Sequence, residues 1–311
     1  MTLTETTPTT RFVLILILTL VWGCNWPVLK MGVTEFAPLT FRCLTLPLAA
    51  FGLLLAARMS GDSTRVPRRL WKRLLALAFF NIGAWNGLVL FGLQQLPAGR
   101  SAILAYTMPI WATMIAAILL HEPLSRRKLF GLVLGAAGMA VLLGDQIGVM
   151  RKAPLGALMI LAAAISWGIG TVLLRKWQLP IPQNTLSGWM MLFGWLPLGL
   201  LAPFLDPLPW AVEFGNASAR AWFAVGYNVF LAGTLAHWAW FTLARTLPVA
   251  VSSLSSLPVP VVGVISGILL LGERPGPQEW LALALVVAAL FVVMFQPNRR
   301  RAAAAPLTPV D

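Results

Sequence analysis

A duplicated pattern of prolines, a serine and an acid constrains the fold of this chain more than any other sequence feature. The segment 96–123 begins with Leu-Pro, continues as an apolar run with a proline near its middle and ends in an acid, and the segment 247–275 repeats that order. At a shift of 151 residues four positions coincide: Pro97 with Pro248, Ser101 with Ser252, Pro109 with Pro260, and Glu122 with Glu273. Coincidence of four positions at one shift indicates an internal repeat, and a repeat determines the architecture of the whole chain.

The composition predicts that this repeat lies in a membrane. The chain is 59% hydrophobic and only 11% charged. Its long uncharged runs are dominated by Leu, Ala, Val and Ile, which favours transmembrane helices over barrel strands. The net charge of +13 would suggest nucleic acid in a soluble protein, but the basic residues occupy short loops and no basic patch is interleaved with base-stacking aromatics. We therefore predict an all-α integral membrane protein that contacts membrane lipid and binds no nucleic acid.

Ten apolar segments are long enough to cross a hydrocarbon core of roughly 30 Å. We predict spans at 12–33, 37–57, 70–94, 98–120, 128–145, 154–176, 184–205, 219–243, 249–271 and 278–296. The first span is retained rather than removed as a signal peptide, because the bulky Trp22 would lie beside the cleavage point and many spans follow. The predicted units are a first five-helix repeat at 1–148, a second at 149–298 and a flexible basic tail at 299–311.

The Lys and Arg residues are distributed unequally between the two sides of these spans. The side that holds both termini carries 16 of them and the other side carries 6. Since the more basic side of a membrane protein faces the cytoplasm, we expect both termini there. Because five is an odd number, the second five spans begin from the opposite side, so the two repeats are inverted. Many secondary transporters build two exchangeable states around a midplane site in this way.

A weaker sequence match links the two halves at a second place: the pair Trp22-Gly23 of the first span occurs again as Trp167-Gly168 in the sixth. Together with Leu-Pro-x3-Ser, the central proline and the terminal acid of spans four and nine, this order resembles the drug/metabolite transporter superfamily, and within it the EamA-type exporters. The resemblance covers roughly residues 11–296 and points to the bacterial exporters of aromatic amino acids. It implies a central cavity lined mainly by spans 1, 3, 4, 6, 8 and 9, and outward transport of amino acids and related metabolites across the bacterial inner membrane.

The sequence lacks the residues that catalysis or ion coupling would need. All ten acids lie in predicted loops, tails or helix ends, whereas proton and sodium carriers usually keep a carboxylate mid-membrane. There is no phosphate-binding glycine loop, no metal-ligand cluster and no nucleophile with a neighbouring base, and Cys24 and Cys43 lie in apolar segments without metal-ligand spacing. We predict a protein that is not an enzyme and that uses no metal or cofactor.

Polar and aromatic residues that gather inside the spans are the candidates for a substrate site. Asn81 and Trp85 are four residues apart and share a helix face, and helical spacing also places Tyr227 and Trp238 on one face. The full predicted substrate-binding set is Trp22, Asn25, Asn81, Trp85, Asn86, Tyr106, Trp167, Tyr227, His237, Trp238, Ser252 and Ser255. At the shift of 151 residues Asn86 matches His237, which makes these two pseudo-symmetric partners.

Structural roles compete with this interpretation. Asn, Ser and Thr in membrane helices often hydrogen-bond a neighbouring helix, and His237 could be a structural histidine whose hydrogen bonds are satisfied. Of the basic residues, Arg42 lies deepest inside a predicted span. It could face a vestibule and attract carboxylates, but it lies near a span end, and we favour snorkelling toward the interface. For Glu122 and Glu273 we favour pairing at helix ends or loops over contact with substrate.

These features favour an exporter that works by alternating access. Pro109, Pro258 and Pro260 leave carbonyls unpaired and weaken spans 4 and 9, so these helices could bend as gates. The small-molecule substrate would be held by aromatic rings, amides and hydroxyls and would move down its own gradient without ion coupling. We expect a monomer or a weak dimer. Two alternatives remain: a proton-coupled exporter of drugs and organic cations, which would need a membrane carboxylate, and a channel, which would need a continuous polar stripe.

Overall fold

The computed structural model describes residues 8–121, 124–148, 154–206, 214–240 and 258–294, and all regular elements within these ranges are helical. They are, in chain order, α1 (Pro8–Glu35), α2 (Pro38–Met59), η1 (Arg68–Leu70), α3 (Trp71–Ala78), η2 (Phe79–Ala84), α4 (Trp85–Gln95), α5 (Ala98–Ala105), α6 (Met108–Leu119), α7 (Arg126–Gly148), α8 (Pro154–Trp177), α9 (Gln183–Leu205), α11 (Ala219–Gly226), η3 (Tyr227–Leu235), α14 (Pro258–Leu271) and α15 (Pro277–Met294). Residues 236–240 continue η3 as an α-helix.

Six helical stretches in the described ranges are long and apolar enough to cross a membrane. They are Phe12–Glu35, Pro38–Met59, Arg68–Gln95, Ala98–Leu119, Leu155–Trp177 and Gln183–Leu205, and the apolar helices Pro258–Leu271 and Pro277–Val292 are shorter. Large apolar side chains cover the outside of the bundle, with Phe204 83% and Leu269 76% exposed. Such an apolar exterior suits lipid and would be unstable in water. The protein is therefore an all-helical, multi-pass membrane protein.

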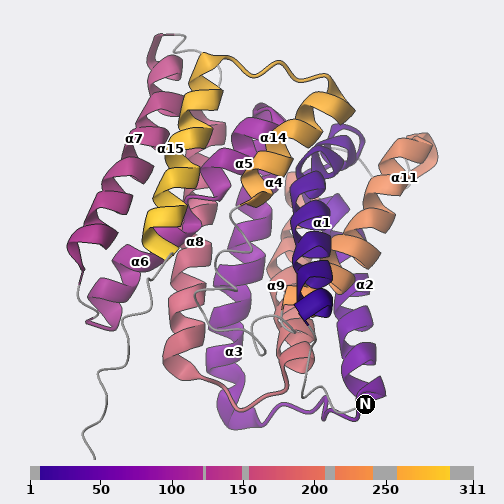
Figure 1. Ribbon diagram of the computed structural model, residues 1–311. Helices are drawn as coiled ribbons and strands as arrows, with labels where there is room; N and C mark the ends of the chain where they lie inside the picture. Colours follow the sequence, from indigo (N-terminus) through magenta and orange to yellow (C-terminus); the bar gives the residue numbers. More distant parts are fainter. Residues whose placement is uncertain (1–7, 122–123, 149–153, 207–213, 241–257, 295–311) are drawn as a thin grey trace, which may run out of the picture.

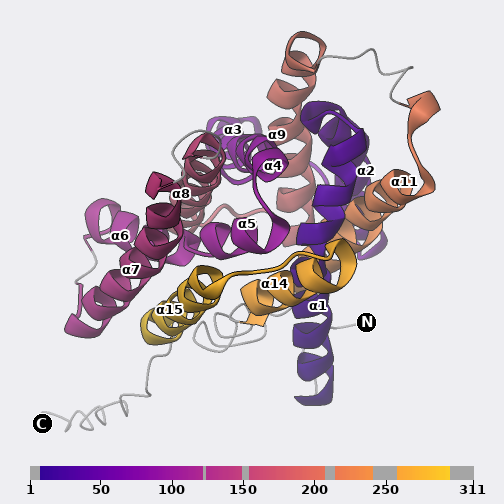
Figure 2. The same ribbon diagram turned by 90° about the horizontal axis from the view of Figure 1, so that it is seen from above.

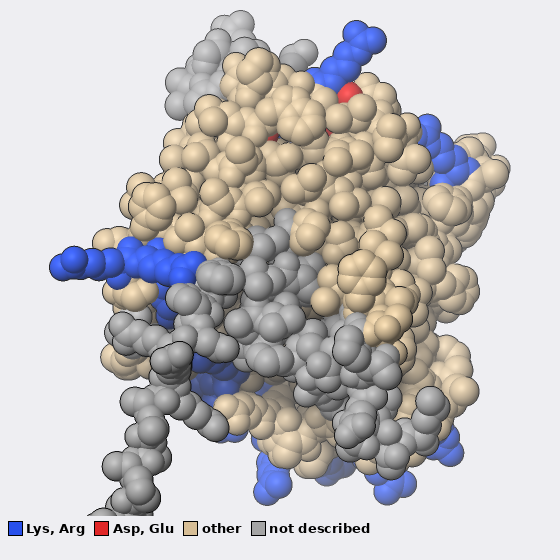
Figure 3. Space-filling view, viewed as in Figure 1, with Lys and Arg blue, Asp and Glu red and all other residues tan. Residues whose placement is uncertain are grey.

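The helices form two flanks with a central group between them. Figures 1 and 2 show α6, α7 and α15 on one flank, α1, α2 and α11 on the other, and α4 and α5 in the middle. The face seen in Figure 3 is mostly uncharged, and the Lys and Arg side chains gather at its borders, most of them toward the lower end. The largest buried cluster of apolar side chains lies at the centre of the bundle and includes Trp26, Leu93 and Ile103.

Two of the predicted continuous spans contain π-helical segments. In the stretch 68–95 the segment η2 separates α3 from α4, and η3 follows α11 directly in the stretch that begins at Ala219. At the shift of 151 residues, η2 (79–84) falls on positions 230–235, which lie inside η3. A π turn holds an extra residue and leaves carbonyls available for other partners, and such turns are frequent at functional sites. The same irregularity thus occurs at equivalent positions of the two sequence copies.

Elements of the two halves pack against each other in matched pairs. Helix α2 packs against α9, α7 against α15, α1 against α14, and α8 against α6. The π segments follow the same rule, because η3 packs against α2 and η2 packs against α9. Both contacts need a glycine: a Cβ on Gly52 of α2 would come within 2.7 Å of Thr234 Oγ1, and a Cβ on Gly194 of α9 within 2.4 Å of Ile82 Cβ. Larger residues at these two positions would push the π segments away.

The predicted span 98–120 is not one helix. It is interrupted at Tyr106 and Thr107, between α5 and α6, directly before Pro109. The Thr107 hydroxyl donates a hydrogen bond to the Leu104 carbonyl at 2.6 Å, and Trp111 Nε1 donates to the Thr107 hydroxyl at 3.1 Å. The interruption is explained by Pro109, which lacks an N–H and clashes with a continuous preceding turn. Of the other predicted gating prolines, Pro258 and Pro260 open α14, and the earlier part of the predicted span 249–271 lies outside the described residues.

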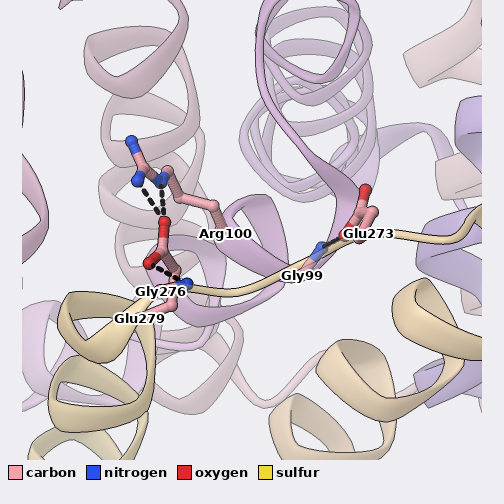
Figure 4. Close-up of polar contacts among 5 residues, drawn as sticks. All are labelled: Gly99, Arg100, Glu273, Gly276 and Glu279. Atoms are coloured by element: carbon pink, nitrogen blue, oxygen red, sulfur yellow. Dashed lines mark hydrogen bonds and ion pairs between the residues drawn. The ribbon is translucent and has the colours of Figure 1, made fainter.

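Acidic side chains join the ends of helices that are distant in the sequence. Glu273, which follows α14, accepts hydrogen bonds from the backbone N–H groups of Ala98 at 2.5 Å and of Gly99 at 2.9 Å, at the N-terminus of α5. A carboxylate is favourable there because the first N–H groups of a helix lack partners. Glu279 of α15 binds Arg100 of α5 and accepts from the N–H of Gly276 at 2.9 Å (Figure 4). The sequence prediction of helix-end pairing is therefore confirmed for Glu273, and Glu122 lies outside the described residues.

Two further acids connect elements in the same manner. Asp206, at the end of α9, accepts hydrogen bonds from the N–H and the hydroxyl of Thr40 in α2, at 2.6 and 2.5 Å. Glu35, at the end of α1, accepts from the N–H and the hydroxyl of Ser218, both at 2.7 Å. Each of these acids makes charge-assisted hydrogen bonds between separate elements, so the helix ends are firmly connected.

Candidate functional site

A cavity of about 120 Å³ lies inside the bundle and is lined by residues of both sequence halves. Its wall is formed by α1, α2, η2, α4, α8, α9 and η3 together with the break between α5 and α6. Seven residues of the predicted substrate-binding set line it, namely Trp22, Asn25, Trp85, Asn86, Tyr106, Trp167 and His237. Residues far apart in the chain thus meet around one cavity.

One side of the cavity is a face of α1 that contacts η3. The residues of α1 that line the cavity are Trp22, Asn25, Trp26 and Leu29. The last three follow the first by three, four and seven positions, which is the spacing of one face of an α-helix. The indole of Trp22 lies edge-on to the ring of His237, with centroids 5.4 Å apart and planes at 74°. This T-shaped arrangement is a favourable one for aromatic rings.

The carbonyl of Ala232 in η3 holds both of these rings. It accepts a hydrogen bond from Trp22 Nε1 at 3.3 Å and lies 2.9 Å from His237 Nδ1. Because a carbonyl can only accept, Nδ1 of His237 carries a hydrogen. The π segment thus supplies the carbonyl that orients the ring pair.

The opposite side of the cavity is formed by a second pair of rings. Trp85 of α4 and Trp167 of α8 have centroids 5.0 Å apart with planes at 57°. Next to them, Asn86 Nδ2 donates to the Ile82 carbonyl at 2.8 Å, and Tyr106 is buried at the break before α6. Such aromatic and amide groups can hold an apolar or aromatic side chain and a polar head in one site.

Arg42 of α2 also lines the cavity, and the favoured prediction of snorkelling is wrong. The side chain is only 5% exposed, and its Nη1 donates to Asn228 Oδ1 of η3 at 3.3 Å. Its guanidinium also lies over the ring of Phe41, 5.6 Å from the centroid. Snorkelling fails because α2 turns this face toward η3, where an amide oxygen is closer than the interface.

Among the described residues that line the cavity there is no Asp or Glu. The described part of the chain also contains no group of His, Cys, Asp and Glu able to hold a metal ion. A wall of indole rings, amides and one guanidinium can bind and orient a molecule, but it offers no acid–base pair or nucleophile for a reaction.

Three predicted site residues lie elsewhere in the structure. Asn81 is buried against Gly170 of α8, the Tyr227 hydroxyl donates to the Val21 carbonyl at 2.8 Å between η3 and α1, and Trp238 is 38% exposed. Trp238 was predicted to share a helix face with Tyr227, and neither residue lines the cavity. The residues of this stretch that do line it include Asn228, Ala232 and His237, which follow the wider spacing of the π turns in η3. Ser252 and Ser255 lie outside the described residues.

The cavity also contains polar residues that the predicted set lacks. Besides Arg42 these are Thr45 of α2 and Asn228 of η3. Thr45 follows Arg42 by three residues and therefore lies on the same helix face. Two polar residues with that spacing in an otherwise apolar span were the available signal that α2 has a polar face toward the interior.

Comparison with known proteins agrees with a binding cavity of this kind. Residues 10–144 and 154–295 each match the EamA-like transporter family. A protein of known crystal structure superposes with a TM-score of 0.65 at 20% sequence identity, over 92% of this chain and 96% of that one. At that identity the likeness concerns the fold alone.

Several named relatives span nearly the whole chain. The "Probable amino-acid metabolite efflux pump" of Escherichia coli (strain K12) is 28% identical over 299 residues, covering 93% of this chain and 96% of the relative. The "Uncharacterized transporter YoaV" of Bacillus subtilis (strain 168) is 26% identical over 288 residues, covering 92% and 97%. The "Uncharacterized inner membrane transporter YedA" of Escherichia coli (strain K12) is 27% identical over 277 residues, covering 88% and 87%. Because the family model matches most of both halves, the chain belongs to the EamA-like transporter family, and it is a transporter rather than an enzyme.

Proposed function

We propose that this protein exports amino acids, aromatic and other neutral ones, and related small metabolites across the bacterial inner membrane by alternating access. The observation that carries the proposal is the interior cavity, in which two aromatic pairs, Trp22–His237 and Trp85–Trp167, combine with amide groups. Flat rings accommodate apolar and aromatic side chains and attract an ammonium group through cation–π interaction. The relative in Escherichia coli described as a probable amino-acid metabolite efflux pump supports the same substrate class.

The proposed architecture is two inverted five-helix halves, at residues 1–148 and 149–298, with ten membrane spans and a basic tail at 299–311. The packing between the halves supports this arrangement, because equivalent helices pair: α2 packs on α9 and α7 on α15, and the contact of α1 with α14 corresponds to that of α8 with α6. The two π segments at equivalent positions support it as well. The excess of Lys and Arg on the side that holds both termini supports a cytoplasmic position for them. Each aromatic pair joins one residue from each half, so a relative movement of the halves would open and close the cavity.

The proposed hinges are Pro109 in the first half and Pro258 and Pro260 in the second. The interruption at Tyr106 and Thr107 supports this role, because a helix without continuous hydrogen bonds bends at low cost. Tyr106 also lines the cavity, so bending at this point would change the cavity wall directly.

Transport is proposed to be facilitated, without a coupled proton. The lining residues include no carboxylate in the described chain, and a carboxylate is the usual proton carrier in a membrane. The same absence weighs against the alternative of a proton-coupled exporter of organic cations, and the buried Arg42 would repel a cation. Nothing in the described residues favours the channel alternative over a carrier with a central cavity.

Efflux and counterflow in proteoliposomes test the proposal. We expect the purified protein to exchange labelled phenylalanine and leucine for unlabelled amino acid, and to equilibrate them at the same rate with or without an imposed pH gradient. Uphill accumulation driven by protons would contradict the facilitated mechanism. A protein that moves neither amino acid but carries an organic cation would contradict the proposed substrate class.

A further inference from the structure

Two polar atoms in the cavity wall have no hydrogen-bond partner. They are Nε of Arg42, a donor, and Oδ1 of Asn25, an acceptor, and both are buried. Buried polar atoms in native structures are nearly always paired, so each unpaired one calls for an explanation. Here the two lie on different helices, α2 and α1, and their residues line the same cavity.

The positive charge of Arg42 is not compensated by the surrounding protein. Its Nη1 has the neutral amide oxygen of Asn228 as partner at 3.3 Å, and the ring of Phe41 offers only its π face at 5.6 Å. A guanidinium keeps its proton in proteins, and a buried cation is costly unless an anion and several hydrogen bonds accompany it. Because the described cavity wall provides no acid, the compensating anion has to come from the bound molecule.

We propose that Arg42 binds the carboxylate of the transported molecule, which makes a free carboxylate a requirement for transport. Within the proposed amino-acid export on which this inference rests, the guanidinium takes the α-carboxylate and Asn25 Oδ1 accepts a hydrogen bond from the α-ammonium. The side chain of the substrate then lies against the indole rings. A guanidinium is suited to this role because its planar donors match the two oxygens of a carboxylate.

This assignment explains why the cavity contains an arginine at all. An arginine with a purely structural role would have its donors satisfied by protein groups, as Arg100 has through Glu279. In Arg42 the Nε is buried and has no partner in the described structure. The substrate class is therefore narrower than small neutral metabolites in general. It excludes amines without a carboxylate, because they lack the group that compensates the charge of Arg42.

A ligand series on the unmodified protein tests the proposal without any risk to folding. Labelled phenylalanine counterflow is measured with four competitors: phenylalanine, hydrocinnamate, phenylalaninamide and phenethylamine. Hydrocinnamate retains the carboxylate without the ammonium, whereas phenylalaninamide and phenethylamine retain the ammonium without the carboxylate. We expect phenylalaninamide and phenethylamine to compete roughly 10- to 100-fold more weakly than phenylalanine, the range of a lost charge-assisted hydrogen bond. Hydrocinnamate should compete more strongly than either.

Variants then assign the effect to Arg42. Arg42→Gln removes the charge and Arg42→Lys keeps it without the planar fork, and Arg58→Gln is the matched control, since Arg58 is exposed near the end of the same helix. Only folded protein, judged by a single symmetric peak in size-exclusion chromatography, is compared. We expect Arg42→Gln to lose the preference for phenylalanine over its amide, Arg42→Lys to keep part of it, and Arg58→Gln to keep all of it.

The outcomes separate this inference from the proposed function. Phenylalanine counterflow that phenylalaninamide inhibits equally well would overturn the role of Arg42 and leave amino-acid transport intact. A folded Arg42→Gln variant that still discriminates as the original protein does would overturn it as well. Absence of counterflow for every carboxylate tested, with transport of phenethylamine instead, would overturn both.

Discussion

The helix ends and the cavity of this protein use polar residues in opposite ways. At the ends, Glu273, Glu279, Asp206 and Glu35 each bind a group on a different element, so their hydrogen bonds connect the bundle. In the cavity, the amides of Asn86 and Asn228 donate to carbonyls four residues earlier in their own helices. The ends are thus connected by carboxylates that accept hydrogen bonds from other elements, one of them within an ion pair, whereas the cavity keeps its charge without an acidic partner among the described lining residues.

This difference separates residues that hold the structure from residues that hold a ligand. Charge-assisted bonds between elements resist movement, and they are placed where lipid does not surround them. Polar groups bonded to their own helix are stable without a ligand but retain lone pairs and donors toward the cavity. Substitutions at the ends should therefore change stability first, and substitutions in the cavity should change transport first.

The largest effect is expected from the second aromatic pair. Replacing Trp85 or Trp167 with Ala should reduce phenylalanine counterflow by roughly tenfold or more, because each ring contributes stacking as well as buried area. The melting temperature in detergent should fall much less than transport does. Trp238→Ala is the matched control, since this indole is 38% exposed and does not line the cavity. Equal losses at all three positions would remove the distinction between cavity and exterior.

A smaller effect, on stability, is expected at the helix ends. Glu273→Gln keeps the shape of the side chain but loses the negative charge at the N-terminus of α5, which should cost about 1–3 kcal/mol. Thermal unfolding in detergent measures the change, with Asp62→Asn as a control that removes a charge from a turn after α2. If Glu273→Gln instead leaves the melting temperature unchanged and abolishes counterflow, the carboxylate belongs to the transport cycle rather than to the scaffold.

A still smaller energy is expected for the pair Arg100–Glu279, although it is the ion pair drawn in Figure 4. Both side chains are 14% exposed, so water screens the pair only in part. A double-mutant cycle with Arg100→Gln and Glu279→Gln should give a coupling of about 1 kcal/mol in thermal or chemical unfolding. A coupling several times larger would mean that this pair, rather than Glu273, is the main connection between α5 and the stretch from the end of α14 to α15.

The smallest effect is expected at His237. Its ring packs on Trp22 and its Nδ1 is directed to the Ala232 carbonyl, an arrangement that a neutral imidazole satisfies. His237→Gln should therefore leave the response of counterflow to an imposed pH gradient unchanged, although the affinity can decrease. Loss of a pH response that the unmodified protein shows would identify His237 as a proton carrier and would break the assignment of the cavity as a purely binding region.

The sequence predicts the helical membrane class and much of the cavity wall because those features depend on local patterns. Trp22 and Asn25 of the predicted set line the cavity, on a face of α1 that keeps α-helical spacing. Trp167 and Asn86, which also line it, have the repeat counterparts Trp22 and His237. Both signals are contained in single spans or in their duplication, and neither needs knowledge of which helices touch.

The remaining cavity residues could not be predicted because they depend on irregular backbone or on distant contacts. Trp238 was expected on a face shared with Tyr227, but no sequence pattern predicts the π turns of η3, and the residues that line the cavity there are Asn228, Ala232, Gly233 and His237. Arg42 was assigned to the interface because it lies near the end of its predicted span. Its partner Asn228 is 186 residues away in the chain, and the proximity of α2 to η3 arises only in the folded bundle.

The charge of Arg42 has an electrical consequence under alternating access. When the cavity closes on one side of the membrane and opens on the other, the region across which the voltage drops moves from one side of the guanidinium to the other. The positive charge of Arg42 therefore crosses part of the electric field. Moving one full charge through 100 mV is worth about 2.3 kcal/mol. A zwitterion adds no net charge, so the empty and the loaded carrier experience the same field and the electrical work cancels over a complete cycle. The voltage of the cell would thus set how fast the carrier turns over, while the final distribution of the amino acid would depend on its concentrations alone.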